Sequence, residues 1–462
     1  MKIALSPIEL YAAEENAALT KSCINPASCD IFCNVIDNYG DIGVSWRLAR
    51  QLANEFRLNV RMWVDDLASF ARLCPEADAA LEIQNCRGVE VRLWHADAFN
   101  PLPAYRPPSP ASGESEVRGA EPAGAEGTAG EANLSNVIPA DLVIEAFSCT
   151  LPESYLAAMM EIANKSDQSQ AIWINLEYLS AENWVEGCHK LPSPRPPLTR
   201  YFFFPGFTKR TGGLLLERDL LARRDAFLND ELQQKVFWKS IGMQMPAADT
   251  LKISLFAYEN AALEGLFDAW VSGEQPVLCL VPEGRILPQV VQYFADAMPV
   301  NSPLPPTGEG VEERACYSRG NLQVRVLPFV EQELYDELLW ACDINFVRGE
   351  DSCVRAQWAG KPFVWQIYPQ HDAVHWEKLQ AFLDLYDAAL SPEAARAMQG
   401  LWRAWNGGAG GVAWAEFDAA RAELDERAKS WARELSENNL ALNLLDFFQE
   451  IGRMRAFEIE GQ

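Results

Sequence analysis

The chain has 462 residues, 49% of them hydrophobic, a length and composition that suit two or three folded domains with sizeable cores. It carries 65 acidic against 39 basic residues, a formal charge of -26 at pH 7. This charge argues against nucleic acid or an anionic membrane as a direct partner, because both attract basic surfaces. Eleven cysteines stand without a C-x-x-C pair, and no run is apolar enough to span a bilayer. We therefore expect a cytoplasmic protein with free thiols.

Residues 1–27 lack the basic start and apolar core of a secretory signal and are expected to be a loose extension. From residue 28 onward, short β-branched or aromatic runs alternate with amphipathic helical stretches, the pattern of a parallel α/β sheet. The strands expected in this first half are 29–36, 59–66, 89–97, 140–148 and 171–179, and the helices are 44–56 and 152–166. This half is expected to be a Rossmann-like domain at 28–248. It carries a disordered insertion at 101–136, which is rich in Pro, Gly, Ala, Ser and Glu.

A second α/β series begins near Thr250 and predicts another Rossmann-like domain at 249–438, with a smaller insertion at 301–320. Its expected strands are 251–259, 276–284, 322–330, 343–347 and 362–368, and its helices include 331–341 and 352–360. The fold class is thus α/β, with two Rossmann-like domains in tandem. Apolar helices follow, and the last segment, 439–462, can pack back on either half.

One polar stretch in each half lies between a strand and a helix, where open α/β sheets bind ligands. The first, "DNYGDIG" at 37–43, carries Asp37 and Asp41, and two acids beside small residues suit proton transfer or cation binding. The alternative is structural, with Asp41 capping a helix that begins near Val44 and Asp37 closing a turn. Neither stretch contains a dinucleotide or P-loop glycine motif.

The second stretch, "RGEDS", leads from a strand into a helix. Arg348 and the free amides of the helix start suit a phosphate, and Glu350 and Asp351 suit the hydroxyls of a sugar or ribose. The alternative is that Asp351 or Ser352 is only an N-cap and Glu350 only a partner of the helix dipole. In "ISLFAYE", Phe256 and Tyr258 share one face of a strand end, where they can contact a base and a phosphate or else pack in a core. His371 and His375 lack a third metal ligand, and no metal is expected.

Several blocks in order resemble the protein-arginine rhamnosyltransferases of elongation factor P, the EarP family. The blocks are "IFCNVIDNYGDIGVSWRLARQLA", "INLEYLSAE", "YFFFPGFTKRTGGLLLE", "ISLFAYE" and "FVRGEDSCVRAQWAGKPFVWQIYPQHD". The resemblance implies a GT-B glycosyltransferase fold with two domains facing across a cleft. It also implies that the acceptor binds the first domain, that the donor binds the second, and that the last helix returns to the first.

The resemblance further implies transfer of L-rhamnose from TDP-β-L-rhamnose, with inversion and without a metal or other cofactor, to an arginine of elongation factor P. This transfer would activate the factor to relieve ribosome stalling at polyproline. Asp41 is then the expected general base, Asp37 its neighbour and Glu350 a further catalytic residue. The expected donor contacts are Phe256, Tyr258, Gln332, Arg348, Glu350, Asp351 and Ser352. The alternative function is a GT-B enzyme with another nucleotide sugar or a small-molecule acceptor.

Overall fold

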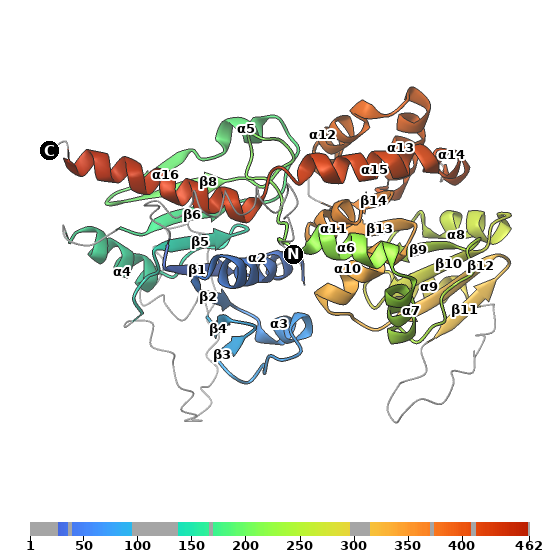
Figure 1. The fold of residues 1–462 in the computed structure, drawn as a ribbon, viewed down its shortest axis with the longest axis horizontal. Coiled ribbons are helices and arrows are strands. Elements are labelled where there is room, and N and C mark those ends of the chain that lie inside the picture. Colours follow the sequence, from blue (N-terminus) through green and yellow to red (C-terminus); the bar gives the residue numbers. More distant parts are fainter. Residues whose placement is uncertain are drawn as a thin grey trace, which may run out of the picture.

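The computed structural model describes residues 26–35, 39–94, 137–165, 170–295, 315–369, 374–407 and 413–460. These residues form two β-sheets, one of eight strands and one of six, each covered by helices (Figure 1). The extension before Pro26, the first insertion and most of the second lie outside the described residues.

The first sheet has the order β3-β4-β2-β1-β5-β6-β8-β7. Its strands are β1 (Ser28–Cys33), β2 (Asn59–Val64), β3 (Ile83–Cys86), β4 (Val89–Leu93), β5 (Leu142–Ala146), β6 (Ile172–Leu176), β7 (Pro192–Arg195) and β8 (Leu198–Phe203). The inner strands pair in parallel, and only the edge strands β3 and β7 are antiparallel to their neighbours. The helices of this half are α2 (Gly40–Phe56), α3 (Leu67–Leu73), α4 (Glu153–Ala163) and α5 (Trp184–Cys188). Sequence periodicity did not predict the short antiparallel edges.

The second sheet has the order β11-β12-β10-β9-β13-β14. Its strands are β9 (Leu251–Leu255), β10 (Val277–Pro282), β11 (Cys316–Arg319), β12 (Leu322–Leu327), β13 (Ile344–Arg348) and β14 (Phe363–Gln366). The helices beside it include α8 (Leu263–Ser272), α9 (Leu287–Tyr293), α10 (Gln332–Ala341), α11 (Asp351–Ala359), α12 (Val374–Tyr386), α13 (Pro392–Trp405) and α14 (Trp414–Ala419). All of its pairings are parallel except β11 with β12.

The predicted insertion at 301–320 is too long at its carboxyl end. Cys316–Arg319 is strand β11, which pairs antiparallel with β12 and places Cys316 opposite Arg325. Gly320 between the two strands has φ +53°, a left-handed conformation that favours glycine at a tight hairpin turn. The polar letters "CYSRG" thus belong to an edge hairpin, whose strands need only one buried face.

Several helices connect the two halves. α6 (Leu220–Asn229) and α7 (Glu231–Ser240) pack into the core of the second sheet, although the predicted domain boundary places them with the first. α15 (Arg421–Leu435) also packs there, and α16 (Leu440–Glu460) then runs across the first half (Figure 1). The buried apolar residues of α16 join the core of the first sheet. The burial of these apolar residues therefore holds the C-terminal helix α16 against the first domain.

None of the helices in the described ranges is both long and apolar enough to cross a membrane. The cysteines within those ranges are all free thiols.

Candidate active site between the two domains

A cleft that is partly open to solvent lies between the two halves. Most of its wall follows the carboxyl ends of strands in the two sheets. The lining residues are Tyr39, Gly40, Arg47, Leu73, Phe256, Tyr258, Pro282, Glu283, Phe329, Val330, Gln332, Tyr335, Arg348, Gly349, Glu350, Asp351 and Ser352. The cleft therefore gathers every predicted donor contact, although these residues are spread over nearly 100 positions of the sequence.

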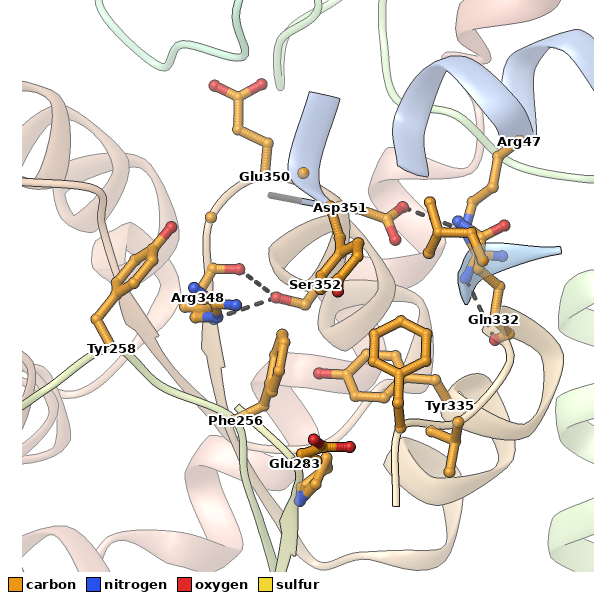
Figure 2. Close-up of a pocket in the computed structure, with 17 residues that line it drawn as sticks. Arg47, Phe256, Tyr258, Glu283, Gln332, Tyr335, Arg348, Glu350, Asp351 and Ser352 are labelled. Atoms are coloured by element: carbon orange, nitrogen blue, oxygen red, sulfur yellow. Dashed lines mark hydrogen bonds and ion pairs between the residues drawn. The ribbon is translucent and has the colours of Figure 1, made fainter. Parts of the chain in front are cut away.

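Arg348, the last residue of β13, is the centre of the second domain's wall. Its guanidinium carbon lies 4.5 Å from the ring centroid of Phe256 and 4.5 Å from that of Tyr258 (Figure 2). Both rings follow the end of β9, the strand beside β13. Arg348 is only 7% exposed, and its Nε and Nη1 have no hydrogen-bond partner among the described residues. Buried charged donors without partners are costly, so this arrangement fits an anionic ligand.

The start of helix α11 lies directly beside Arg348. Its N-cap residue, Glu350, makes no side-chain capping bond to the first amides of the helix. The Ser352 hydroxyl instead donates to the carbonyl of Arg348 and accepts from its amide at 3.1 Å. Tyr335 borders the same site, and burial raises the pKa of its hydroxyl well above the usual range, whereas the neighbouring Ser352 lowers it. The site thus offers donor groups and a helix dipole.

Three predicted donor contacts have partners in the first domain. An Oε2 atom of Glu350 accepts from the amide of Leu179 at 3.0 Å, and its carboxylate points away from Phe256 in Figure 2. Asp351 Oδ1 accepts from Nε of Arg47 at 3.1 Å. Gln332 Nε2 donates to the carbonyl of Gly43 at 3.1 Å. These side chains line the cleft and also hold its two walls together.

The first domain contributes the start of helix α2. The expected start near Val44 is wrong, because the helix begins at Gly40 and includes Asp41 in its first turn. Asp41 is therefore not the N-cap, which is Tyr39, and its carboxylate lies at the positive end of the helix dipole. Asp41 is 7% exposed and follows Gly40, which lines the cleft. Asp37 lies outside the described residues.

Aromatic rings from both domains meet in the cleft wall. The rings of Tyr39 and Phe329 lie 4.9 Å apart. Arg72 lies over both, 5.9 Å from Tyr39 and 5.2 Å from Phe329, and it also bonds Glu283 at 3.2 Å. Both members of that ion pair are about half exposed, so water screens their attraction.

Sequence reasoning missed Arg47, Tyr335 and the pair of Tyr39 and Phe329. A signal for Arg47 was present, because Gly40, Gly43 and Arg47 follow one another at i, i+3 and i+7 on one face of the helix. A cation aligned with two glycines indicates a close approach of another element. No comparable local signal marks Tyr335, which stands in an ordinary amphipathic helix.

Two Rossmann-like domains that face each other across a cleft at the carboxyl ends of their strands have the arrangement of the GT-B fold. The family model described as Elongation-Factor P (EF-P) rhamnosyltransferase EarP matches residues 29–107 and 127–449. The chain belongs to this family.

Named relatives and a solved structure agree with this assignment. A Pseudomonas putida protein named protein-arginine rhamnosyltransferase is 46% identical over 428 residues, which cover 92% of this chain and 99% of the relative. A protein of the same name from Pseudomonas aeruginosa is 43% identical, with the same coverage. A solved structure described as the structural basis for EarP-mediated arginine glycosylation of translation elongation factor EF-P matches with a TM-score of 0.55 and 34% identity. The match covers 91% of this chain and 98% of that one.

Proposed function

We propose that this protein transfers L-rhamnose from TDP-β-L-rhamnose to an arginine side chain of elongation factor P, with inversion at the anomeric carbon. The main support for binding of the sugar donor comes from Arg348. Its buried Nε and Nη1 have no hydrogen-bond partner among the described residues. Family membership supports the acceptor and the sugar. The cytoplasm, where a translation factor is available, is the proposed location.

The diphosphate of the donor is assigned to Arg348 and the start of helix α11. A guanidinium and free helix amides stabilise negative charge, which grows on the diphosphate as the bond to the sugar breaks. Phe256 and Tyr258 hold Arg348 from both sides and leave its donor nitrogens for the ligand. These groups supply the charge stabilisation, so we propose that transfer requires no metal.

Asp41 is assigned as the general base. The side chain of arginine has a pKa above about 12, so its nitrogen is a poor nucleophile until a carboxylate orients it and accepts a proton. In the proposed step a guanidinium nitrogen forms a bond to the anomeric carbon, and the bond from that carbon to the diphosphate oxygen breaks. TDP leaves with the electron pair, and the proton from the attacking nitrogen passes to Asp41. Attack opposite the leaving group inverts the anomeric configuration.

Intact mass spectrometry of the cognate elongation factor P tests the donor, the acceptor and the reaction together. The factor is incubated with this protein and TDP-rhamnose, with parallel samples that contain UDP-glucose, no donor, or TDP-rhamnose with EDTA. We expect a gain of one deoxyhexose with TDP-rhamnose, with and without EDTA, and fragmentation should place it on an arginine. No gain, despite calorimetric binding of the donor, would favour the alternative of another acceptor, and a gain only without EDTA would contradict the metal-free mechanism.

A further inference from the structure

A buried cluster of charges joins the two domains beside the cleft. Arg47 on α2 and Arg355 on α11 are each 2% exposed, and both pair with Asp336 on α10 and with Glu217. Arg47 also pairs with Asp351. Although burial opposes it, the two arginines hold the pKa of Glu217 at about 2, so this carboxylate is charged at neutral pH. The cluster therefore places two cations among three carboxylates.

Every N–H group of Arg47 has a protein partner. Nε donates to Asp351, Nη1 to Glu217 and Asp336, and Nη2 to Asp336 and to the carbonyl of Gln332, at 3.1 to 3.4 Å. A guanidinium has five N–H groups, so none is left for a ligand. Although Arg47 lines the cleft, its geometry is that of a clamp between domains.

The clamp acts through the helix that carries the proposed base. Asp41 and Arg47 are both on α2, six residues apart, which is about 9 Å along a helix axis. Gly43, between them, lies against the second domain. A Cβ atom there would lie 3.4 Å from Nε2 of Gln332 and 3.5 Å from Oδ2 of Asp351. The second domain therefore contacts α2 at two positions after Asp41, at Gly43 and at Arg47.

We propose that Arg47 is a positioning residue for the transfer reaction: by joining α2 to α10 and α11, it fixes the base Asp41 against the donor site across the cleft. The proposal rests on Asp41 as the base. Because Arg47 and Asp41 are on one rigid helix, a shift of Arg47 also shifts Asp41. The contacts of Arg47 therefore help to set the distance between the attacking nitrogen and the anomeric carbon. A misplacement of about 1 Å at that distance lowers turnover by roughly 10²-fold.

Arg47→Met tests the clamp, because methionine keeps an apolar stem of similar reach and removes the charge. We expect turnover at saturating substrates to fall about 10²-fold, while the calorimetric dissociation constant for TDP stays within about threefold. Hydrogen–deuterium exchange should rise in Gln332–Ala341 and Asp351–Ala359, where the partners of Arg47 lie. Arg47→Lys should recover only part of the turnover, because an ammonium cannot bond all four partners at once.

The matched control is Arg61→Met. Arg61 also pairs with a fully buried carboxylate, that of Asp30, but the pair lies entirely within the first domain. Its loss should lower the melting temperature and leave exchange in α10 and α11 unchanged. Gly43→Val provides an independent variant, because its branched side chain should push α2 away without removing a charge. It should reproduce the loss of turnover.

Three outcomes would overturn the proposal. Turnover of Arg47→Met within threefold of wild type, with a lower melting temperature, would make the residue structural only. A loss of TDP affinity as large as the loss of turnover would make it a donor contact. Unchanged exchange in α10 and α11 would show that it does not hold the domains together. The exchange measurement needs no reaction, so it separates failure of the clamp from failure of the proposed function.

Discussion

The cleft contains two buried arginines, Arg348 in the second domain and Arg47 in the first. They differ in whether their N–H groups have hydrogen-bond partners within the protein. Arg47 uses all five of its N–H groups on protein oxygens, and all of these acceptors except Glu217 belong to the second domain. Arg348 is held between two aromatic rings, and its Nε and Nη1 have no hydrogen-bond partner among the described residues. The same side chain thus serves as a domain clamp where carboxylates surround it, and as an anion site where aromatic rings flank it.

The largest expected effect concerns the base on the Arg47 side of the cleft. Asp41→Asn keeps the shape of the side chain but cannot accept the proton of the attacking guanidinium. We expect turnover to fall about 10³-fold, within the range for general bases, while TDP binding stays within a few-fold. Single-turnover kinetics and calorimetry measure the two quantities. Wild-type turnover in this variant would remove the assignment of Asp41 as the base.

A smaller effect is expected on the donor side. Arg348→Met removes the two nitrogens that we assign to the diphosphate. A hydrogen bond to a charged group contributes about 1.5–3 kcal/mol, so loss of even one such bond to the diphosphate should lower TDP affinity roughly 10- to 150-fold. Calorimetry with TDP measures this loss, and Arg325→Met on strand β12 of the same sheet is a control at a residue that does not line the cleft. Equal affinities for Arg348→Met and wild type would place the diphosphate elsewhere.

A substitution of Glu350 tests whether a residue that lines the cleft in the second domain also links the two domains. Its carboxylate accepts a bond from the amide of Leu179 across the cleft, and Glu350→Ala leaves that amide without its partner. We expect kcat/KM to fall roughly tenfold, the effect of losing one charge-assisted hydrogen bond. Initial rates over a range of TDP-rhamnose concentrations measure it. A wild-type rate and donor titration curve would show that Glu350 has no role in the reaction.

The smallest effect is expected for the exposed pair between the domains. Arg72→Ala removes the bond to Glu283 and the contacts with Tyr39 and Phe329. Water screens exposed ion pairs and weakens exposed cation–π contacts, so we expect their combined contribution to stay at about 1 kcal/mol and kcat/KM to change less than about fivefold. If Arg72→Ala reduced the rate as much as Arg47→Met does, burial would not be what distinguishes the two cross-domain arginines.

A change in ionic strength should affect the exposed Arg72 pair and the buried Arg47 cluster differently. An ion pair in water loses most of its attraction as ionic strength rises, whereas a pair enclosed by protein is screened much less. The Arg72 pair belongs to the first kind and the Arg47 cluster to the second. The ratio of Arg72→Ala to wild-type rates should therefore approach one at high salt, while the ratio for Arg47→Met should persist.

The sequence by itself determined the features that depend on short-range pattern. Alternation of strands and helices predicted two parallel sheets, because periodicity and chain direction are local properties. Arg348, Phe256 and Tyr258 lie at strand ends in the sequence pattern. Parallel strands present their carboxyl ends together, so the pattern placed these residues at the edge of the sheet where ligands bind. Family blocks added the chemistry of the reaction.

The tertiary structure decided which charges pair and where several elements begin or end. Arg47 meets Asp351 across 304 residues of sequence, and no local pattern encodes a contact of that range. The association of α6 with the core of the second sheet likewise depends on partners far along the chain. Whether an arginine binds a ligand or joins two domains is set by the groups that folding places around it. Those groups decide whether its N–H bonds are used within the protein or left for a substrate.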